Sequence, residues 1–119
     1  MRTLFTLLFI LLTSYTQSQN IFIRLNGNKA ELRQTSGNLI RYIGNNDVVF
    51  CDINNEQNYI LITTTSGKVE LRSSNNNLIR YIGNNNIINA RWSGNEIILK
   101  TKSGKIEIRT VNNNLIRII

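Results

Sequence analysis

Three glutamates at one position of a repeated segment are the first residues in this sequence that suggest chemistry. Glu31, Glu70 and Glu107 each stand in the middle of a Lys-x-Glu-x-Arg segment. Catalysis by a pair of carboxyl groups needs the two groups roughly 5–10 Å apart, and each repeat unit supplies only one of them. We therefore interpret these glutamates as partners of basic residues across a strand pair, and we expect no catalytic carboxylate pair.

The other reactive side chains are few and lack the partners that catalysis or metal binding requires. The 119 residues include one cysteine, Cys51, and no histidine, so the thiol has no imidazole base beside it. Asp47, Asp52 and Glu56 surround one loop, but the residue pattern of a calcium-binding loop is missing. We expect neither a metal ion nor another cofactor, and the protein is predicted not to be an enzyme.

The remaining candidates for ligand binding gather around the loop in which the repeat units differ most. Residues 54–58 (NNEQN) form this loop in one unit, whereas residues 93–95 (SGN) replace it in the next. Trp92 aligns with Ile53 of the preceding unit, so it is either a core residue or an aromatic platform for a ligand such as a sugar. The predicted ligand-binding residues are Trp92, Arg91, Asp52 and Glu56.

A repeated block must position these side chains, and it accounts for nearly all of the sequence after the first twenty residues. Lys29, Lys68 and Lys105 each open a Lys-x-Glu-x-Arg segment, 39 and then 37 residues apart, and each segment is followed by LIRYI or LIRII. The repeat divides the chain into a partial unit and two full units: residues 20–43, 44–82 and 83–119.

Each full unit alternates between apolar and polar residues with a period of two, which predicts four short β-strands joined by tight turns. The first two strands, such as VVFCDI and YILITTT, are apolar on both faces, whereas the last two carry charge on one face. Inner strands buried twice and outer strands half exposed are typical of a radial blade. We therefore predict an all-β fold of four-stranded antiparallel meander repeats that form propeller-type blades, with an incomplete ring in one chain.

The turns between the second and third strands predict how these strands pair. If residues 103–104 (Ser-Gly) form a two-residue turn, Lys100 lies opposite Glu107. The same reasoning places Arg24 opposite Glu31 in the first unit. Opposite charges in such positions stabilise a sheet by about 0.2–1 kcal/mol per pair, so the charges support this register.

The chain is basic, with 14 Lys and Arg against 7 Asp and Glu and a net charge of +7. Arg41, Arg80 and Arg117 share one position in the fourth strand of each unit, where we expect them to keep an outer edge strand from pairing with other sheets. Nucleic-acid recognition would need aromatic or groove-fitting elements next to the basic surface, so a nucleic-acid partner is not expected.

Residues 83–119 resemble a degenerate WD repeat, whose pattern runs from Gly-His to Trp-Asp over about 40–45 residues and four strands. GNNNIINARW corresponds to the Gly-His start and the first strand, SGNEIILKTKSGKIEIR to the central hairpin, and TVNNNLIRII to the last strand. Residues 44–82 match in the same way, and residues 21–43 match the last three strands. The resemblance covers nearly all of the chain after the first twenty residues and implies blades of the WD-repeat type.

The chain departs from the WD pattern at both ends of a unit. Asn45 and Asn84 stand where the pattern has histidine. Arg72-Ser73 and Arg109-Thr110 stand where it has Trp-Asp. The hydrogen-bond network between His and Asp that is typical of the family is therefore not expected here.

Propellers usually close with about 4–8 blades, and this sequence supplies two full units and three strands of another. Several copies can assemble into a closed ring, the sequence can be a fragment of a larger propeller, or an open array can add units end to end. We expect a non-catalytic binding or protein-interaction module whose partner is another protein or a second copy of the chain. The alternatives are a carbohydrate-binding propeller lectin and a self-assembling surface β polymer.

Residues 1–18 differ in composition from the repeats and have the order of a secretory signal peptide. Arg2 precedes an apolar run of about nine residues, Leu4 to Leu12, and small polar residues follow it. Such a run is too short for a membrane span. We expect cleavage near Ser18 and a secreted, periplasmic or cell-surface protein. In the alternative interpretation, residues 11–16 form the inner strand of the first unit.

Overall fold

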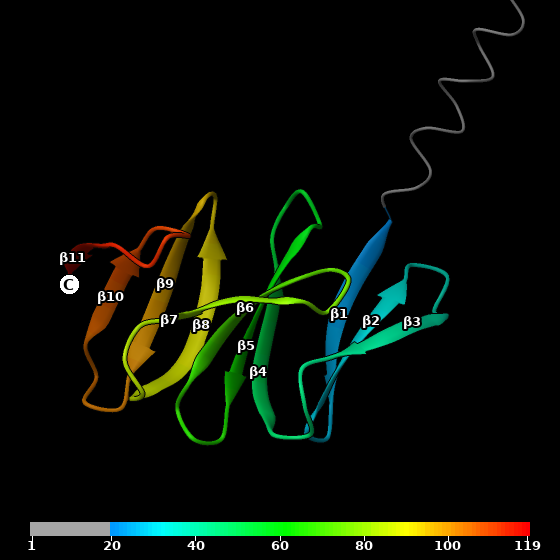
Figure 1. The fold of residues 1–119 in the computed structure, drawn as a ribbon, viewed down its shortest axis with the longest axis horizontal. Helices are drawn as coiled ribbons and strands as arrows, with labels where there is room; N and C mark the ends of the chain where they lie inside the picture. The colour runs from blue at the N-terminus through cyan, green and yellow to red at the C-terminus, as the bar shows by residue number, and fades with distance from the viewer. Residues whose placement is uncertain (1–19) are drawn as a thin grey trace, which may run out of the picture.

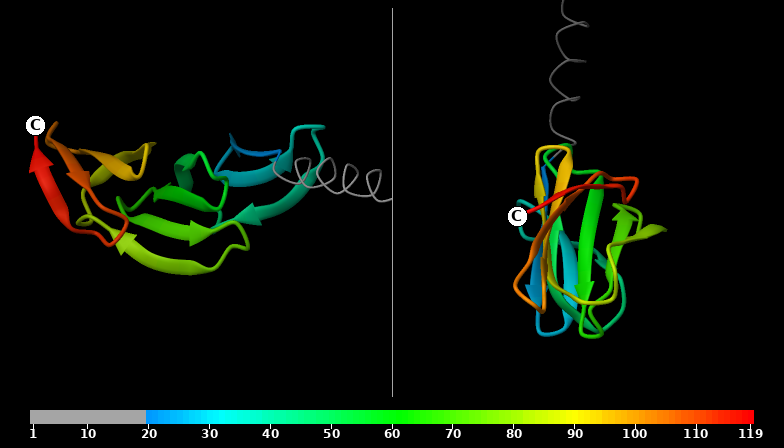
Figure 2. Two further views of the ribbon diagram at one scale, coloured as in Figure 1. Left: turned by 90° about the horizontal axis from the view of Figure 1, so that it is seen from above. Right: turned by 90° about the vertical axis from the view of Figure 1, so that its left-hand side faces the viewer.

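The computed structural model describes residues 20–119, which form eleven β-strands in three antiparallel sheets (Figure 1). The predicted signal peptide, residues 1–18, lies outside the described residues. The sheets stand side by side and follow an arc when they are viewed from above (Figure 2). The predicted all-β fold of antiparallel meander units is confirmed.

Each sheet is one blade, and its strands pair in the order of the chain. Blade 1 has three strands: β1 (Ile21–Asn26), β2 (Lys29–Gln34) and β3 (Leu39–Ile43). Blade 2 has four: β4 (Val48–Ile53), β5 (Tyr59–Thr64), β6 (Val69–Ser73) and β7 (Leu78–Ile82). Blade 3 also has four: β8 (Ile87–Ser93), β9 (Glu96–Thr101), β10 (Ile106–Arg109) and β11 (Leu115–Ile118). Among residues 20–119, blade 1 therefore has no counterpart of the inner strands β4 and β8, and β1 forms its inner edge.

The hydrophobic cores lie between neighbouring blades rather than within one sheet. Between blades 1 and 2 the buried residues are Ala30, Leu32, Ile43, Val48, Ile60 and Ile62. Between blades 2 and 3 they are Leu61, Val69, Leu71, Ile82, Ile87, Ala90, Ile97 and Leu99. Neighbouring residues of β5 thus face opposite blades, because successive side chains of a strand point to opposite faces. The predicted burial of the inner strands on both faces is confirmed for β5, but it is wrong for β4 and β8, in which Val49 and Ile88 are each 42% exposed.

The predicted strand register is correct in the first blade and wrong in the third. Arg24 lies opposite Glu31 across the two-residue turn between β1 and β2. In blade 3, however, Glu107 lies opposite Leu99 rather than Lys100. The predicted pairing of Lys100 with Glu107 is therefore wrong, and the same shift of one residue occurs in blade 2.

The length of the hairpin loop explains the shift. Residues 102–104 form a three-residue loop, in which the Thr101 amide donates to the Lys105 carbonyl (2.9 Å) and the Gly104 amide donates to the Thr101 carbonyl (3.0 Å). Gly104 has a φ of 91°, as the last residue of such a loop requires. The same loop recurs in blade 2 at residues 65–67, so both hairpins pair one residue away from the prediction.

The three repeated glutamates are buried and pair with arginines on their own strand. Glu31, Glu70 and Glu107 are 3, 6 and 7% exposed. Each accepts a hydrogen bond of 2.7–2.9 Å from the Nε of the arginine two residues further along. The predicted ion pair with a basic residue on the neighbouring strand is present only at Glu31, whose Oε1 lies 3.5 Å from Nε of Arg24. Residues two apart in a strand share one face, so each Glu-x-Arg pair is built into its strand.

The arginine of the pair also takes part in a contact between blades. Arg72 donates from Nη1 to Oδ1 of Asn76 (3.2 Å), and this oxygen also accepts the backbone N–H of Gly44, at the end of blade 1 (2.8 Å). The same arrangement joins blades 2 and 3 through Arg109, Asn113 and Gly83. A Glu–Arg–Asn network therefore connects successive blades in a chain that lacks the histidine of the WD pattern.

The arginines of the outer strands bind the next blade as well. Arg41 in β3 donates from Nη1 to the carbonyl of Ser74 (2.6 Å), and Arg80 in β7 donates to the carbonyl of Val111 (2.6 Å). Arg41 and Arg80 therefore each fasten their blade to the next, a role that the expected protection of an edge strand did not include. Arg117 holds the same position in β11 and has no such bond within residues 20–119.

The pairing of Glu31 predicts how the stability of blade 1 depends on pH. The hydrogen bond from Arg33, followed by that from Asn26, lowers the pKa of Glu31 below its ordinary value of 4.5. A lowered folded pKa adds stability that is complete above the unfolded pKa and is lost as the pH falls through the folded one. We therefore expect Arg33→Gln to reduce the free energy of unfolding more at about pH 7 than at about pH 2.5.

Urea denaturation of the wild type and of Arg33→Gln at both pH values measures this difference. The variant also loses contacts that do not titrate, and their contribution is the same at both pH values. An equal loss of stability at the two pH values would show that the Glu31 carboxylate gains nothing from its arginine.

Candidate functional site

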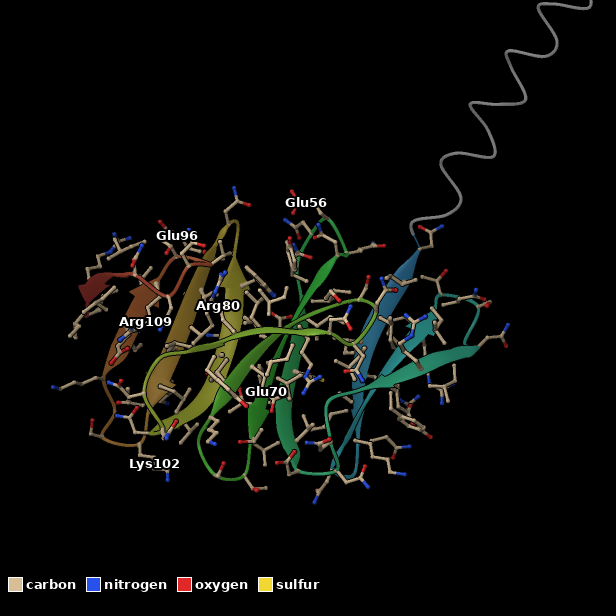
Figure 3. The ribbon with its side chains drawn as sticks, in the orientation of Figure 1. Glu56, Glu70, Arg80, Glu96, Lys102 and Arg109 are labelled. Atoms are coloured by element: carbon tan, nitrogen blue, oxygen red, sulfur yellow. The ribbon has the colours of Figure 1, made fainter. Side chains whose placement is uncertain are left out.

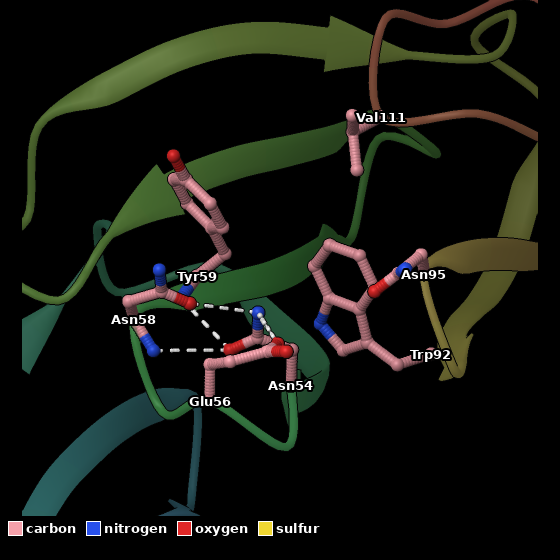
Figure 4. Close-up of a pocket in the computed structure, with 7 residues that line it drawn as sticks. All are labelled: Asn54, Glu56, Asn58, Tyr59, Trp92, Asn95 and Val111. Atoms are coloured by element: carbon pink, nitrogen blue, oxygen red, sulfur yellow. Dashed lines mark hydrogen bonds between the residues drawn. The ribbon is translucent and has the colours of Figure 1, made fainter.

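A pocket of about 430 Å³ lies where the loops of blades 2 and 3 meet (Figure 4). Blade 2 contributes the β4–β5 loop and the start of β5, and blade 3 contributes the β8–β9 hairpin and the β10–β11 loop. The lining residues are Asn54, Glu56, Asn58, Tyr59, Trp92, Asn95 and Val111. Two aromatic rings, three amides and one carboxylate therefore meet in a single cavity.

Asn54 organises the loop that forms one wall of the pocket. Its buried Oδ1 accepts the backbone N–H groups of Asn58 and Tyr59, both at 3.0 Å. Its Nδ2 donates to Oδ1 of Asn58 (2.8 Å) and to Oε1 of Glu56 (3.3 Å). Gln57 adopts a φ of 62° to complete the turn. The Asn54 side chain thus accepts backbone N–H groups that have no backbone partner in the loop. It also positions the Glu56 carboxylate.

Trp92 in β8 joins the pocket to the core between the blades. Its backbone N–H donates to Oδ2 of Asp52 in β4 (2.9 Å), and its ring packs against the cluster between blades 2 and 3. The indole Nε1 is buried and has no hydrogen-bond partner among the described residues. Trp92 is therefore both a core residue and a wall of the pocket, so the two interpretations of this residue from the sequence are compatible.

The structure brings two of the four predicted ligand-binding residues together. Trp92 and Glu56 both line the pocket. Asp52 does not line it, but its carboxylate holds the backbone of Trp92. Arg91 is exposed and is not one of the lining residues.

The other five lining residues were not among the predicted ligand-binding residues. Tyr59 directly follows residues 54–58, so its position next to the inserted loop is a signal in the sequence that it lies near the site. Val111 gives no such signal, because it comes from the β10–β11 loop and reaches the pocket only through the stacking of the blades.

The charges at the two ends of the blades differ in sign. Glu56 and Glu96 lie at the end that holds the pocket, whereas Lys102 lies at the opposite end (Figure 3). Glu56 is the one charged residue among those that line the pocket. In a chain with a net charge of +7, the pocket is thus a locally acidic site.

A second candidate binding surface is the face of blade 3 that points away from blade 2. Its apolar residues hold the positions that Leu61, Val69, Leu71 and Ile82 hold in blade 2, where blade 3 covers them. We call this surface the open face, and its residues are Ile98, Ile106, Ile108, Arg117 and Ile119.

The exposure of equivalent residues shows that the open face has the composition of a buried junction. Ile43 at the end of blade 1 and Ile82 at the end of blade 2 are 0 and 1% exposed, whereas Ile119 is 73% exposed. Arg117 extends the series of Arg41 and Arg80, which bind the next blade. The open face therefore carries both the apolar residues and the arginine that join two blades elsewhere in the chain.

The opposite end of the array, the outward face of blade 1, is built differently. Arg24 holds the position that Ile62 and Leu99 hold in the receiving faces of blades 2 and 3. Gly37 stands in the outer loop where Asn76 and Asn113 accept the N–H of the preceding blade. This end thus lacks two of the features that receive a neighbouring blade.

The reactive groups of the described residues show no catalytic arrangement. Burial, with a smaller contribution from Asp52, raises the pKa of the Cys51 thiol to about 11, so the nucleophilic thiolate is scarce at neutral pH. Across residues 20–119, no three residues among Asp, Glu, Cys and His are grouped closely enough to hold a metal ion. In the same part of the chain, no helix has the length and apolar character needed to cross a membrane.

No protein-family model matches this sequence, and no curated protein is significantly similar to it. The fold, however, is similar to solved structures. A chain of the crystal structure of the mitotic checkpoint complex matches with a TM-score of 0.70 and 14% identity over 85% of this chain and 34% of that one. The crystal structure of the WD40 β-propeller domain of Doa1 matches with a TM-score of 0.67 and 16% identity over 86% of this chain and 37% of that one. The chain thus spans about a third of each of these two matched chains. The predicted propeller fold of WD-repeat type is confirmed.

Proposed function

We propose that this chain, with its WD40-type propeller fold, is a non-catalytic protein-interaction module whose open face binds a further blade. The observation that carries the proposal is the partial exposure of Ile98 and Ile106, because Leu61 and Val69 are only 0 and 1% exposed at the same positions of blade 2. Repeat units of this kind bury their apolar faces only against a neighbour, and the open face has the residues of a buried junction without one.

The chemistry of the open face specifies the partner. The incoming blade must supply an inner strand with apolar side chains, because β8 of blade 3 packs in this way on β4 and β5. It must also offer a loop carbonyl to Arg117, as Val111 does to Arg80. A blade like blade 2 or blade 3 meets these requirements.

A second copy of the chain meets them less well. The receiving face that remains free in a second copy is that of blade 1, which carries Arg24 in place of an isoleucine or leucine and Gly37 in place of an asparagine. We therefore favour a different blade-bearing polypeptide over a ring of identical copies. The signal peptide predicted in residues 1–18 supports a site of action outside the cytoplasm.

A four-blade chain, in which a second copy of residues 83–119 follows Ile119, tests the proposal. In this chain Ile119 is followed by glycine, as Ile82 is followed by Gly83. Covering Ile119 and its neighbours should raise the free energy of unfolding by about 2–4 kcal/mol, measured by urea denaturation. The matched control is the same four-blade chain with the Arg117→Ala substitution at the new junction, which should lose about 1 kcal/mol of this gain.

Two outcomes would overturn the proposal. The added blade could unfold in a separate transition, or the main transition could keep its midpoint. Sedimentation velocity of the unmodified chain separates the ring of identical copies from the favoured version. A stable dimer that Ile119→Asp dissociates would show that a second copy, rather than another polypeptide, covers the open face.

A further inference from the structure

We infer that the pocket between blades 2 and 3 is a binding site for an alkylammonium group, the cation found on lysine side chains and at peptide amino termini. The inference does not depend on the open face, because the pocket lies within the described blades. It rests on two features of the lining residues: an available carboxylate and two aromatic rings.

Glu56 supplies the negative charge. Its Oε1 accepts one hydrogen bond, from Asn54 Nδ2 at 3.3 Å, and no Lys or Arg of residues 20–119 forms an ion pair with it. Three of the other carboxylates in these residues, Glu31, Glu70 and Glu107, are paired with arginine. The Glu56 carboxylate is therefore positioned and free to accept a charge-assisted hydrogen bond from a ligand.

Tyr59 and Trp92 supply the aromatic walls. The two rings lie on either side of the space above Glu56 and Asn54 (Figure 4). An ammonium group within about 6 Å of a ring centroid gains roughly 0.5–2 kcal/mol from the ring. The chain makes this contact elsewhere with its own residues: the Lys29 ammonium lies 5.0 Å from the Tyr42 ring centroid.

The amides of the pocket favour a ligand that donates hydrogen bonds. Both polar atoms of the Asn54 side chain are engaged within the loop, and Asn58 Oδ1 accepts one of its bonds. The Trp92 indole N–H is buried, so a ligand cannot reach it without a shift of the loop. An ammonium group has only donors to offer. A neutral sugar would find donors at Asn58, Asn95 and the Tyr59 hydroxyl, so the free carboxylate and the aromatic rings, rather than a lack of donors, favour the cation.

Intrinsic fluorescence tests the inference directly, because Trp92 is the single tryptophan of the chain. We expect butylammonium chloride to change the emission of the full chain in a saturable way, and the neutral isostere 1-butanol to leave it unchanged at equal concentration. Nα-acetyl-lysine amide and alanine amide present the ammonium of a side chain and of an amino terminus. If Nα-acetyl-lysine amide binds more tightly, the natural ligand is a lysine side chain, and if alanine amide binds more tightly, it is a peptide amino terminus.

Glu56→Gln removes the charge at an exposed position and keeps the size of the side chain, so the fold should not change. This variant should weaken butylammonium binding by about tenfold or more. The matched control is Glu96→Gln, which removes a carboxylate at the same end of the blades outside the pocket lining. It should bind like the wild type.

Three results would overturn the inference. Equal binding of butylammonium and 1-butanol would show that only apolar contact matters. An equal loss in Glu56→Gln and Glu96→Gln would show a general effect of surface charge. Saturable binding of methyl glycosides that Glu56→Gln leaves unchanged, with no binding of butylammonium, would assign the pocket to carbohydrate.

Discussion

Gly67→Ala is expected to destabilise the chain by about 3–5 kcal/mol, whereas Gly104→Ala should cost only about 1–2 kcal/mol. Both residues end the same three-residue loop, with φ values of 89° and 91°. A Cβ at Gly67 would lie 2.8 Å from the carbonyl oxygen of Asn85, at the start of blade 3, whereas a Cβ at Gly104 would meet nothing within 4 Å. Both substitutions place a Cβ on a backbone with positive φ, so this strain is the same in both. The difference between the two losses of stability therefore measures how closely blade 3 approaches blade 2 at Gly67.

Urea denaturation of the two variants gives both free energies. Equal losses would mean that the Asn85 backbone moves aside at little cost and that the blades are not held tightly. The four-blade chain adds a sharper comparison. If the added blade docks on the open face as blade 3 docks on blade 2, Gly104→Ala in that chain should become as costly as Gly67→Ala.

Arg72→Ala should reduce the free energy of unfolding by about 3–5 kcal/mol, because it leaves a buried carboxylate without its partner. Glu70 is 6% exposed, and its Oε1 lies 2.7 Å from Arg72 Nε. The substitution also removes the contact of Arg72 with Asn76, whose side chain binds the end of blade 1. The loss therefore combines an unpaired charge with a weakened junction.

The double variant Glu70→Leu/Arg72→Leu is the control for this prediction. Replacing a buried ion pair by apolar residues of similar volume is often close to neutral, so the double variant should regain most of the stability that Arg72→Ala loses. If it is as unstable as the single variant, the contact of Arg72 with the Asn76 loop, rather than the charge of Glu70, accounts for the effect.

The blades themselves could be predicted from the sequence, because strand alternation and the spacing of the repeats are local properties. The register of two hairpins could not be predicted by treating every glycine turn alike. In the first hairpin Gly27 is the first residue of a two-residue turn, whereas Gly67 and Gly104 are the last residues of three-residue loops. The position of glycine relative to the following lysine separates the two cases, so this information was present in the sequence.

The contacts between blades depend on geometry that one repeat cannot reveal. Arg41 and Ser74 are far apart in the sequence, and their hydrogen bond follows from how sheets stack. The pocket is a similar case. Trp92 and Glu56 could be selected from the unusual loop, but the approach of Tyr59 and Val111 results from the packing of blade 2 on blade 3.

The replacement of asparagine by Gly37 and of an apolar residue by Arg24 gives the array a polarity. Blades that extend the chain at the open face meet a matching surface, whereas blades that approach blade 1 meet neither the acceptor nor the apolar contact. If blades dock at the open face as proposed, further blades would add at that face and not at the outward face of blade 1, so an array of such blades would grow in one direction.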